Sequence, residues 1–417
     1  MKKYIFGFLL FSSLFSNAQL FDYLPDTASI ARPLKGFANF DLGYFVQTNS
    51  LDKGFLETMI EGGYLDDNFK KTTLAAVEHR MRLGAMVNIS YNRGAKINDK
   101  FGAFIAVQNK TFFNTTLSSD LLRLIFYGNK AFDGRTANMN GFSINAMNYL
   151  KAGGGVYTSL LTKNKEGRFG IGAYYVLGYH HTSFTAKTFE LTTGDNGFYI
   201  DMKADMDLKT TIPDSGAFKL PAGKGFCADL FYETFFTVDK GKGMFQIGVY
   251  DIGTIKWGDN STTYKVDTTF HYQGVEVENI FKIGSSSFNG ASSDSLINKI
   301  FDKKSGSYST ILPAELRASV YLPIHSKVYL STTVRYFYNS NFKTQFIAGV
   351  NYKALKWLMV DAGAGFGGYG SSTVSLGVTA SIKQKTFFRI RATNLEGYFA
   401  KTAQAQGATF SIARLIR

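Results

Sequence analysis

Residues 80–91 read RMRLGAMVNISY, and this stretch decides the fold. Successive side chains of a β-strand point to opposite faces, so residues two apart in the chain share a face. One face is mainly apolar and comprises Met81, Leu83, Ala85, Val87, Ile89 and Tyr91. The other face carries charged, small or polar groups, and comprises Arg80, Arg82, Gly84, Met86, Asn88 and Ser90. The alternation continues for about ten residues, the length of a strand that crosses a bilayer in a β-barrel.

The same period of two returns along the chain, most clearly in residues 200–209, 328–337 and 373–382. A soluble β-sandwich gives such alternation too, but its strands are typically about 5–6 residues long. The faces opposite the apolar ones are rich in Gly, Ser, Asn and charge, as a polar lumen requires, and Tyr and Phe gather near strand ends. We therefore predict an all-β protein, a transmembrane antiparallel up-and-down β-barrel of about 14 strands, with 16 strands as the alternative.

Residues 1–18 have the three-part layout of a secretory signal peptide. Its positive start, apolar stretch and small-residue cleavage site are Lys2-Lys3, Ile5–Phe15 and Ser16-Asn17-Ala18. We expect cleavage between Ala18 and Gln19, and the alternative is an uncleaved N-terminal anchor. An exported barrel belongs in the outer membrane of a Gram-negative bacterium, where its first partner is outer-membrane lipid.

The overall composition excludes several classes of protein. The net charge is +14, but the basic residues are dispersed rather than clustered, so we do not expect nucleic acid as a partner. Cys227 is the one cysteine, which excludes an internal disulfide and a multi-cysteine metal site. A mean hydropathy of −0.07 fits a barrel, because only alternate residues of each strand face lipid.

Three insertions interrupt the strand pattern of the barrel, which we expect to occupy residues 37–417. Residues 50–78 contain two stretches with helical spacing, residues 117–130 contain a helix with Ser118 as its N-cap, and residues 274–310 are rich in Ser and Gly. Irregular backbone cannot face lipid, so these segments belong at the outer rim or in the lumen. The second insertion predicts an apolar rim helix with Leu121, Leu122, Ile125 and Phe126.

Charged side chains on the non-apolar strand faces are the candidate lumen residues. They are Arg80, Arg82, Asp201, Lys203, Asp205, Asp207, Arg335, Arg389 and Arg391. The Asp201–Asp207 ladder is either ordinary lumen lining, with lysines pairing aspartates, or a lumen filter or Ca²⁺ site; we favour the lining, because such a ladder lacks further oxygen ligands. Mixed inward charge of this kind pairs across a lumen and closes it more often than it leaves an open anion channel.

No motif predicts an enzyme. Residues 365–370 read GFGGYG and match the dinucleotide fingerprint, but a strand follows them rather than a helix, so we expect a tight hairpin. His180 and His181 are adjacent on a predicted strand and point to opposite faces, so they cannot hold one metal ion together. We therefore expect no catalytic residue, no cofactor and no metal site.

The Ala18-Gln19 junction, the segment LPAELR at 312–317 and the Gly-rich terminal hairpins resemble the FadL-type outer-membrane barrels. Within these the chain is most similar to poorly characterised Bacteroidota members, some relatives of which are partner barrels of protein-export machinery. The resemblance implies a 14-stranded barrel, a lateral opening at a kinked strand, and an N-terminal segment, here 19–36, that enters the lumen as a hatch. No ligand-contact residue can be matched.

Two functions follow from this reading. The first is passive passage of a small hydrophobic compound, which apolar loop helices would capture at the outer rim. The second is a structural or docking subunit of an outer-membrane protein assembly or export complex, with other outer-membrane proteins as partners. A general diffusion porin is a third possibility, but the sequence shows no open acidic or basic constriction ring, which such a porin would need.

Overall fold

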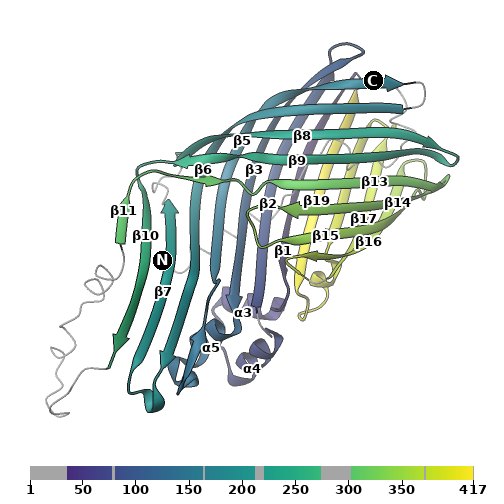
Figure 1. Ribbon diagram of the computed structural model, residues 1–417. Coiled ribbons are helices and arrows are strands. Elements are labelled where there is room, and N and C mark those ends of the chain that lie inside the picture. The colour runs from purple at the N-terminus through teal and green to yellow at the C-terminus, as the bar shows by residue number, and fades with distance from the viewer. Residues whose placement is uncertain are drawn as a thin grey trace.

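The computed structural model describes residues 35–77, 80–162, 165–211, 220–273, 302–370 and 372–416 (Figure 1). The predicted signal peptide, its Ala18-Gln19 cleavage site and all but the last two residues of the predicted hatch lie outside these ranges. Among the residues described, no helix is both long and apolar enough to cross a lipid bilayer.

Fourteen strands of the described residues form a closed antiparallel ring, in which each strand pairs with its two neighbours and β19 pairs with β1. The prediction of a 14-stranded barrel is therefore confirmed. The strands are β1 (Gly36–Thr48), β2 (Arg80–Lys96), β3 (Phe101–Ser118), β5 (Ser143–Thr162), β6 (Lys165–Thr193), β8 (Gly223–Val238), β9 (Gly241–Trp257), β13 (Glu315–His325), β14 (Val328–Phe337), β15 (Lys343–Tyr352), β16 (Leu358–Gly368), β17 (Ser372–Ile382), β18 (Thr386–Thr393) and β19 (Ala405–Ile416).

The register places polar and apolar side chains on opposite sides of this wall. Residues that face each other in an antiparallel pair lie on the same side, so Phe45 and Met86 point inward together and Tyr44 and Val87 outward. The outward side carries an exposed apolar belt to which strands all around the ring contribute. Its members include Ile105, Val156, Phe169, Ile171, Leu230, Ile247, Leu316, Val350, Val378 and Ile390. Such a belt matches the hydrocarbon layer of a bilayer.

The two ends of the ring differ in their connections. Short turns join β2 to β3, β8 to β9 and β13 to β14, and we call this end the turn end. The chain enters and leaves the ring there, because the Lys35 N–H donates to the Ile416 carbonyl at 2.8 Å. The long insertions all lie at the opposite end, the loop end.

Three α-helices lie together at the loop end (Figure 1): α3 (Lys53–Glu61), α4 (Asp67–Ala76) and α5 (Ser119–Tyr127). Asp52, Asp66 and Ser118 cap their N-termini by accepting hydrogen bonds from backbone N–H groups. In α5, Leu121 and Leu122 are buried and Phe126 partly so, whereas Ile125 is 63% exposed. These helices pack on Met81 and Leu83, which lie on the outward side of β2.

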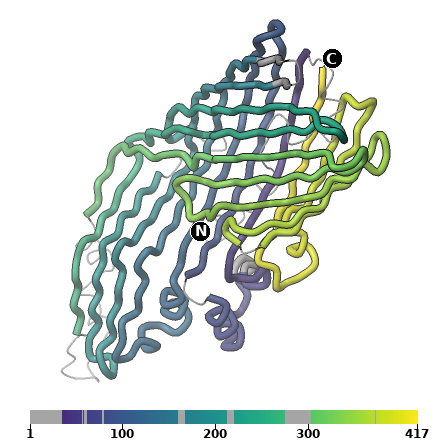
Figure 2. The backbone as a smooth tube through the Cα atoms, turned by 45° about the vertical axis from the view of Figure 1, so that its right-hand side comes forward, coloured from purple at the N-terminus to yellow at the C-terminus, as the bar shows by residue number. Residues whose placement is uncertain are grey.

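Strand β6 is 29 residues long and has two successive partners on one side. Residues 165–178 pair with β8 in the ring, and residues 181–193 pair with β7 (Ile200–Thr211). A curved sheet, the extension, then continues away from the ring through β10 (Ser261–Tyr272) and β11 (Asp302–Ser305) (Figure 2). On its other side, β4 (Arg135–Asn138) pairs with the end of β6. Short 3₁₀ helices span Asn129–Phe132, Asp195–Gly197 and Leu395–Tyr398.

Two expectations need correction in this region. Residues 200–209 form a strand, but β7 belongs to the extension, because alternation predicts a strand and says nothing of its partner. The insertion 274–310 is not irregular throughout: its described residues form β11 and β12 (Tyr308–Ile311), which pair with β10 and β9. Residues 274–301 lie outside the described ranges.

A compact contact between His181, Trp257 and Tyr308 holds the point where the extension leaves the ring. The imidazole of His181 is stacked on Trp257, with ring centroids 5.3 Å apart, and its Nδ1 lies 2.8 Å from the Tyr308 hydroxyl. This junction lies beyond the apolar belt. Next to Trp257 in the chain, Lys256 lies opposite Lys224 in the β8–β9 register, and both lysines are exposed on the outward side.

The stability of this junction should depend on pH. Burial, assisted by the positive charges of His180 and Lys209, lowers the pKa of His181 to about 3. The unfolded chain takes up a proton below about pH 6.5, whereas the folded chain does not. The junction should therefore be fully stable above about pH 6.5 and weaken by up to about 1.4 kcal/mol per pH unit as the pH falls towards 3.

Unfolding of the junction in urea can be followed by the fluorescence of the buried Trp257, in a Trp357→Phe background that removes the other tryptophan. His181→Phe removes the titrating group and should flatten the dependence between pH 7 and pH 5. The same pH dependence in both proteins would contradict the role of His181.

Candidate functional site: the lumen

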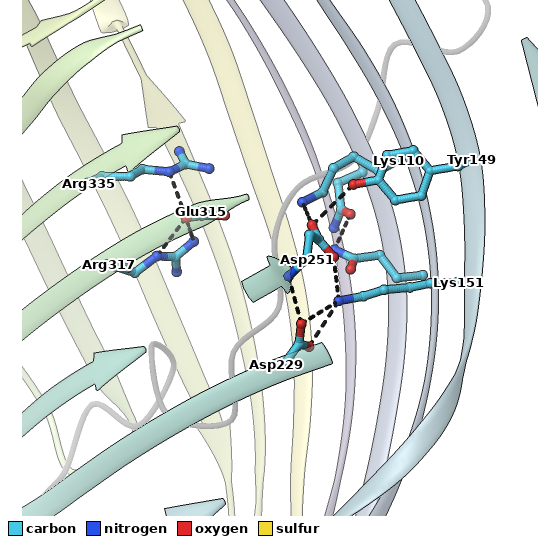
Figure 3. A network of polar contacts seen from close by, with 10 residues as sticks. Lys110, Tyr149, Lys151, Asp229, Asp251, Glu315, Arg317 and Arg335 are labelled. Carbon is cyan, nitrogen blue, oxygen red and sulfur yellow. Dashed lines mark hydrogen bonds and ion pairs between the residues drawn. The ribbon is translucent and has the colours of Figure 1, made fainter. Parts of the chain in front are cut away.

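A buried cluster of charged side chains crosses the lumen at mid-height (Figure 3). The Lys110 ammonium, from β3, donates to Asp251 of β9, although three ring strands lie between β3 and β9. The Lys151 ammonium lies 2.9 Å from the Asp229 carboxylate and 2.6 Å from that of Asp251. The Tyr149 hydroxyl donates to Asp251 at 3.1 Å. Two cations and two anions thus neutralise one another, as buried charges must.

A bulge in β9 places Asp251 in this cluster. The β8–β9 register shifts between Ala228 and Leu230, so that one residue of β8, Asp229, lies opposite two of β9. Asp251 has φ of 60°, a left-handed conformation that Asp tolerates better than most residues. Its backbone N–H donates to the Asp229 carboxylate at 2.8 Å. The bulge therefore turns a carboxylate inward and fixes it to the neighbouring strand.

Two further ion clusters line the same wall. Glu315, the first residue of β13, accepts from Arg317 Nε at 2.9 Å and from Arg335 Nε at 2.8 Å. Asp361 of β16 is bound in the same way by the two arginines of β18, Arg389 and Arg391, each at 3.0 Å. Sequence reasoning selected Arg335, Arg389 and Arg391 but not their carboxylate partners, because each partner is an isolated acidic residue in its own strand.

The other predicted lumen residues lie elsewhere. Arg80 and Arg82 lie at the loop end of β2, where Arg80 donates to the Asn140 carbonyl at 2.8 Å. The ladder of Asp201, Lys203, Asp205 and Asp207 lies on β7 in the extension, outside the ring. Its three carboxylates are 35–45% exposed, and Asp205 makes a surface ion pair with Lys187. Among the described residues, no group of three or more His, Cys, Asp or Glu side chains is placed to hold a metal ion.

Aromatic side chains fill the lumen at its loop end. This loop-end seal consists of Phe45, Met86, Phe112, Phe337, Phe342 and Tyr369, all buried. Phe342 and Tyr369 come from two short connections between strands and meet edge to face, with ring centroids 5.1 Å apart. The GFGGYG segment thus forms the end of a hairpin, in which Gly367 and Gly368 have φ of 96° and 77°. A Cβ at Gly84 would overlap the Tyr369 ring, so Gly84 leaves the space that this ring occupies.

A pocket lies between the ion clusters and the turn end. Its empty volume is about 800 Å³, a figure that includes open solvent. Its walls carry aromatic, small and uncharged polar side chains, and its floor on the loop side is formed by the charged clusters. The lining residues are Ser90, Asn92, Phe104, Ala106, Gln108, Lys110, Lys151, Tyr157, Tyr174, Asp229, Phe231, Gln246, Tyr250, Asp251, Glu315 and Arg317. We call this space the turn-side pocket.

Breaking the central cluster should destabilise the barrel strongly. Asp251→Asn keeps a residue that tolerates the left-handed backbone but leaves Lys110 and Lys151 with one carboxylate fewer. We expect a loss of about 3–5 kcal/mol in the free energy of unfolding, measured by urea titration in lipid vesicles. Asp205→Asn, in the surface pair with Lys187, is the control and should cost less than about 1 kcal/mol. Equal losses of unfolding free energy in the two variants would contradict a larger stabilising role for the central cluster.

Removing the two inserted rings should open the loop end. In a Cys227→Ala background, Ser375→Cys places a thiol at a position that is 3% exposed, inside the seal. Phe342→Ala with Tyr369→Ala should speed its labelling by an impermeant maleimide severalfold. Tyr338→Ala, which truncates a ring that is 55% exposed at the same end, should leave the rate unchanged. An unchanged rate in the double variant would mean that these rings do not close the lumen.

Several solved structures have a similar arrangement of strands. The toluene transporter TodX of Pseudomonas putida is 10% identical, with a TM-score of 0.45 and 96% of this chain and 94% of that chain covered. A FadL homologue of Pseudomonas aeruginosa is 9% identical, with a TM-score of 0.41 and 93% of each chain covered. The translocator domain of the autotransporter NalP from Neisseria meningitidis is 7% identical, with a TM-score of 0.32 and 93% and 90% covered.

These similarities concern barrel architecture alone. They include the FadL type that the sequence resembles, whereas the closeness to Bacteroidota members stays a prediction. No curated protein sequence matches the chain significantly. Residues 38–390 match the model of a protein family described as a family of unknown function, DUF5723. Because this match covers most of the chain, the protein belongs to the family DUF5723.

Proposed function

We propose that this protein is an integral barrel of a bacterial outer membrane through which a small, largely hydrophobic compound passes without energy input. The observation that carries the proposal is the turn-side pocket. It lies inside a barrel, and five aromatic side chains together with a few polar groups line it, which is the kind of lining that small-molecule sites have. It lies inside the lumen, between the ion clusters and the turn end.

The orientation follows from the two ends of the ring. Outer-membrane barrels have short turns on the periplasmic side and longer loops outside. The turn end would then face the periplasm, and the loop-end seal and helices α3–α5 the exterior. Helix α5 buries Leu121 and Leu122 but exposes the apolar Ile125, and this exposed side chain at the rim would meet an apolar compound first.

A gated passage fits the lumen better than an open one. The loop-end seal and the charged clusters both interrupt the lumen, so a water-filled diffusion pore would require both to move. A docking role in a protein assembly remains the alternative from the sequence, and the aromatic pocket gives it no support.

Filling the pocket tests the proposal directly. In asymmetric vesicles with lipopolysaccharide outside, the barrel should speed the entry of N-phenyl-1-naphthylamine, whose fluorescence rises in apolar surroundings. Ala106→Trp projects an indole into the pocket and should return entry towards the rate of empty vesicles. Ala152→Trp, on the outward side of the neighbouring β5, is the matched control and should behave as wild type. Equal entry with and without the barrel would refute passage and leave the docking role.

A further inference from the structure

The turn-side pocket has features that narrow the chemistry of its ligand beyond hydrophobicity. Five aromatic rings line it, from strands β3, β5, β6, β8 and β9. They belong to Phe104, Tyr157, Tyr174, Phe231 and Tyr250. The ring centroids of Phe104 and Phe231 lie 6.0 Å apart with the rings tilted, a separation at which aromatic groups attract one another. A flat aromatic molecule fits such walls better than a flexible aliphatic chain.

The charges at the floor of the pocket already bind one another. Lys110 and Lys151 are bound by Asp229 and Asp251, and Glu315 is bound by Arg317 and Arg335. Lys151 also lies over the Tyr174 ring, 4.4 Å from its centroid. A ligand with a formal charge would have to separate a buried ion pair, which is strongly unfavourable. These charges therefore favour a neutral ligand.

Two buried polar atoms line the pocket without a partner among the described residues. They are the Ser90 hydroxyl oxygen, from β2, and the Gln246 side-chain carbonyl oxygen, from β9. The two residues are only 3% and 4% exposed. A buried polar atom that makes no hydrogen bond is unfavourable by about 1–3 kcal/mol. Each of these oxygens can accept a hydrogen bond from an O–H or N–H group of a ligand in the pocket.

We propose that the turn-side pocket binds a neutral, flat aromatic compound that carries a hydroxyl or amide group. The ligand's O–H or N–H donates to Gln246, and its oxygen accepts from the Ser90 hydroxyl, while its ring packs among the five aromatic side chains. The assignment rests on the proposed function and names the compound class that passes through the barrel.

Three probes of one shape separate the contributions. The intact barrel in lipid nanodiscs is titrated at pH 7 with 2-naphthol, naphthalene and 2-naphthoate, and binding is followed by probe fluorescence. The neutral hydroxylated probe should bind most tightly, because naphthalene lacks the hydrogen-bonding group and naphthoate carries a charge. Gln246→Ala should weaken 2-naphthol binding about tenfold and leave naphthalene binding unchanged. Ser90→Ala gives the same test with a smaller change of side chain.

Gln345→Ala is the matched control, because Gln345 is an equally buried glutamine on β15 outside this pocket. Tighter binding of naphthoate, equal binding of the three probes, or no effect of Gln246→Ala and Ser90→Ala would overturn the assignment. Failure here with vesicle entry intact would leave passage standing with another ligand class. Selective binding without vesicle entry would instead overturn passage and keep the pocket as a binding site.

Discussion

Backbone hydrogen bonding is the constraint on which the rest of this structure depends. In a bilayer no water pairs with an exposed N–H or C=O group, so a sheet that spans it must close on itself. Pairing of β19 with β1 achieves this closure, and it also brings both ends of the ring to one side. Closure then fixes two environments, an apolar belt outside and an enclosed lumen in which every charge needs a partner.

The fold could be predicted from the sequence because the alternation of apolar and polar residues is visible within each strand by itself. The alternation from Arg80 to Tyr91 indicates two different environments without information from any other strand, and the cap at Ser118 marks a helix in the same local way. Pairing is not local. Residues 200–209 alternate as well as any barrel strand, yet β6 continues past the ring and takes β7 as a partner there.

The lumen could be predicted only in part, for the same physical reason. Arg335, Arg389 and Arg391 are evident as inward charges, but Glu315 and Asp361 become their partners only through the pairing of neighbouring strands, β13 with β14 and β16 with β18 through β17. Asp251 is harder still, because its place depends on a bulge that shifts the register of one strand. The seal formed by Phe342 and Tyr369 depends on residues in two connections between strands, 338–342 and 369–370, and the alternating pattern does not extend to such connections.

The bulge at Asp251 also restricts how this chain can vary. Between the pairs Ala228–Ile252 and Leu230–Val249, β8 has one residue and β9 has two. Val249 and Ile252 therefore lie on the same side of the wall although they are three positions apart. Loss of one residue between Gly248 and Gly253 would remove the bulge and leave a single residue of β9 opposite Asp229, so the wall would keep only one of the two side chains, Tyr250 and Asp251, that line the pocket there. Changes of length should therefore accumulate between β1 and β2 or after β10, and be absent from this part of β9 in related chains.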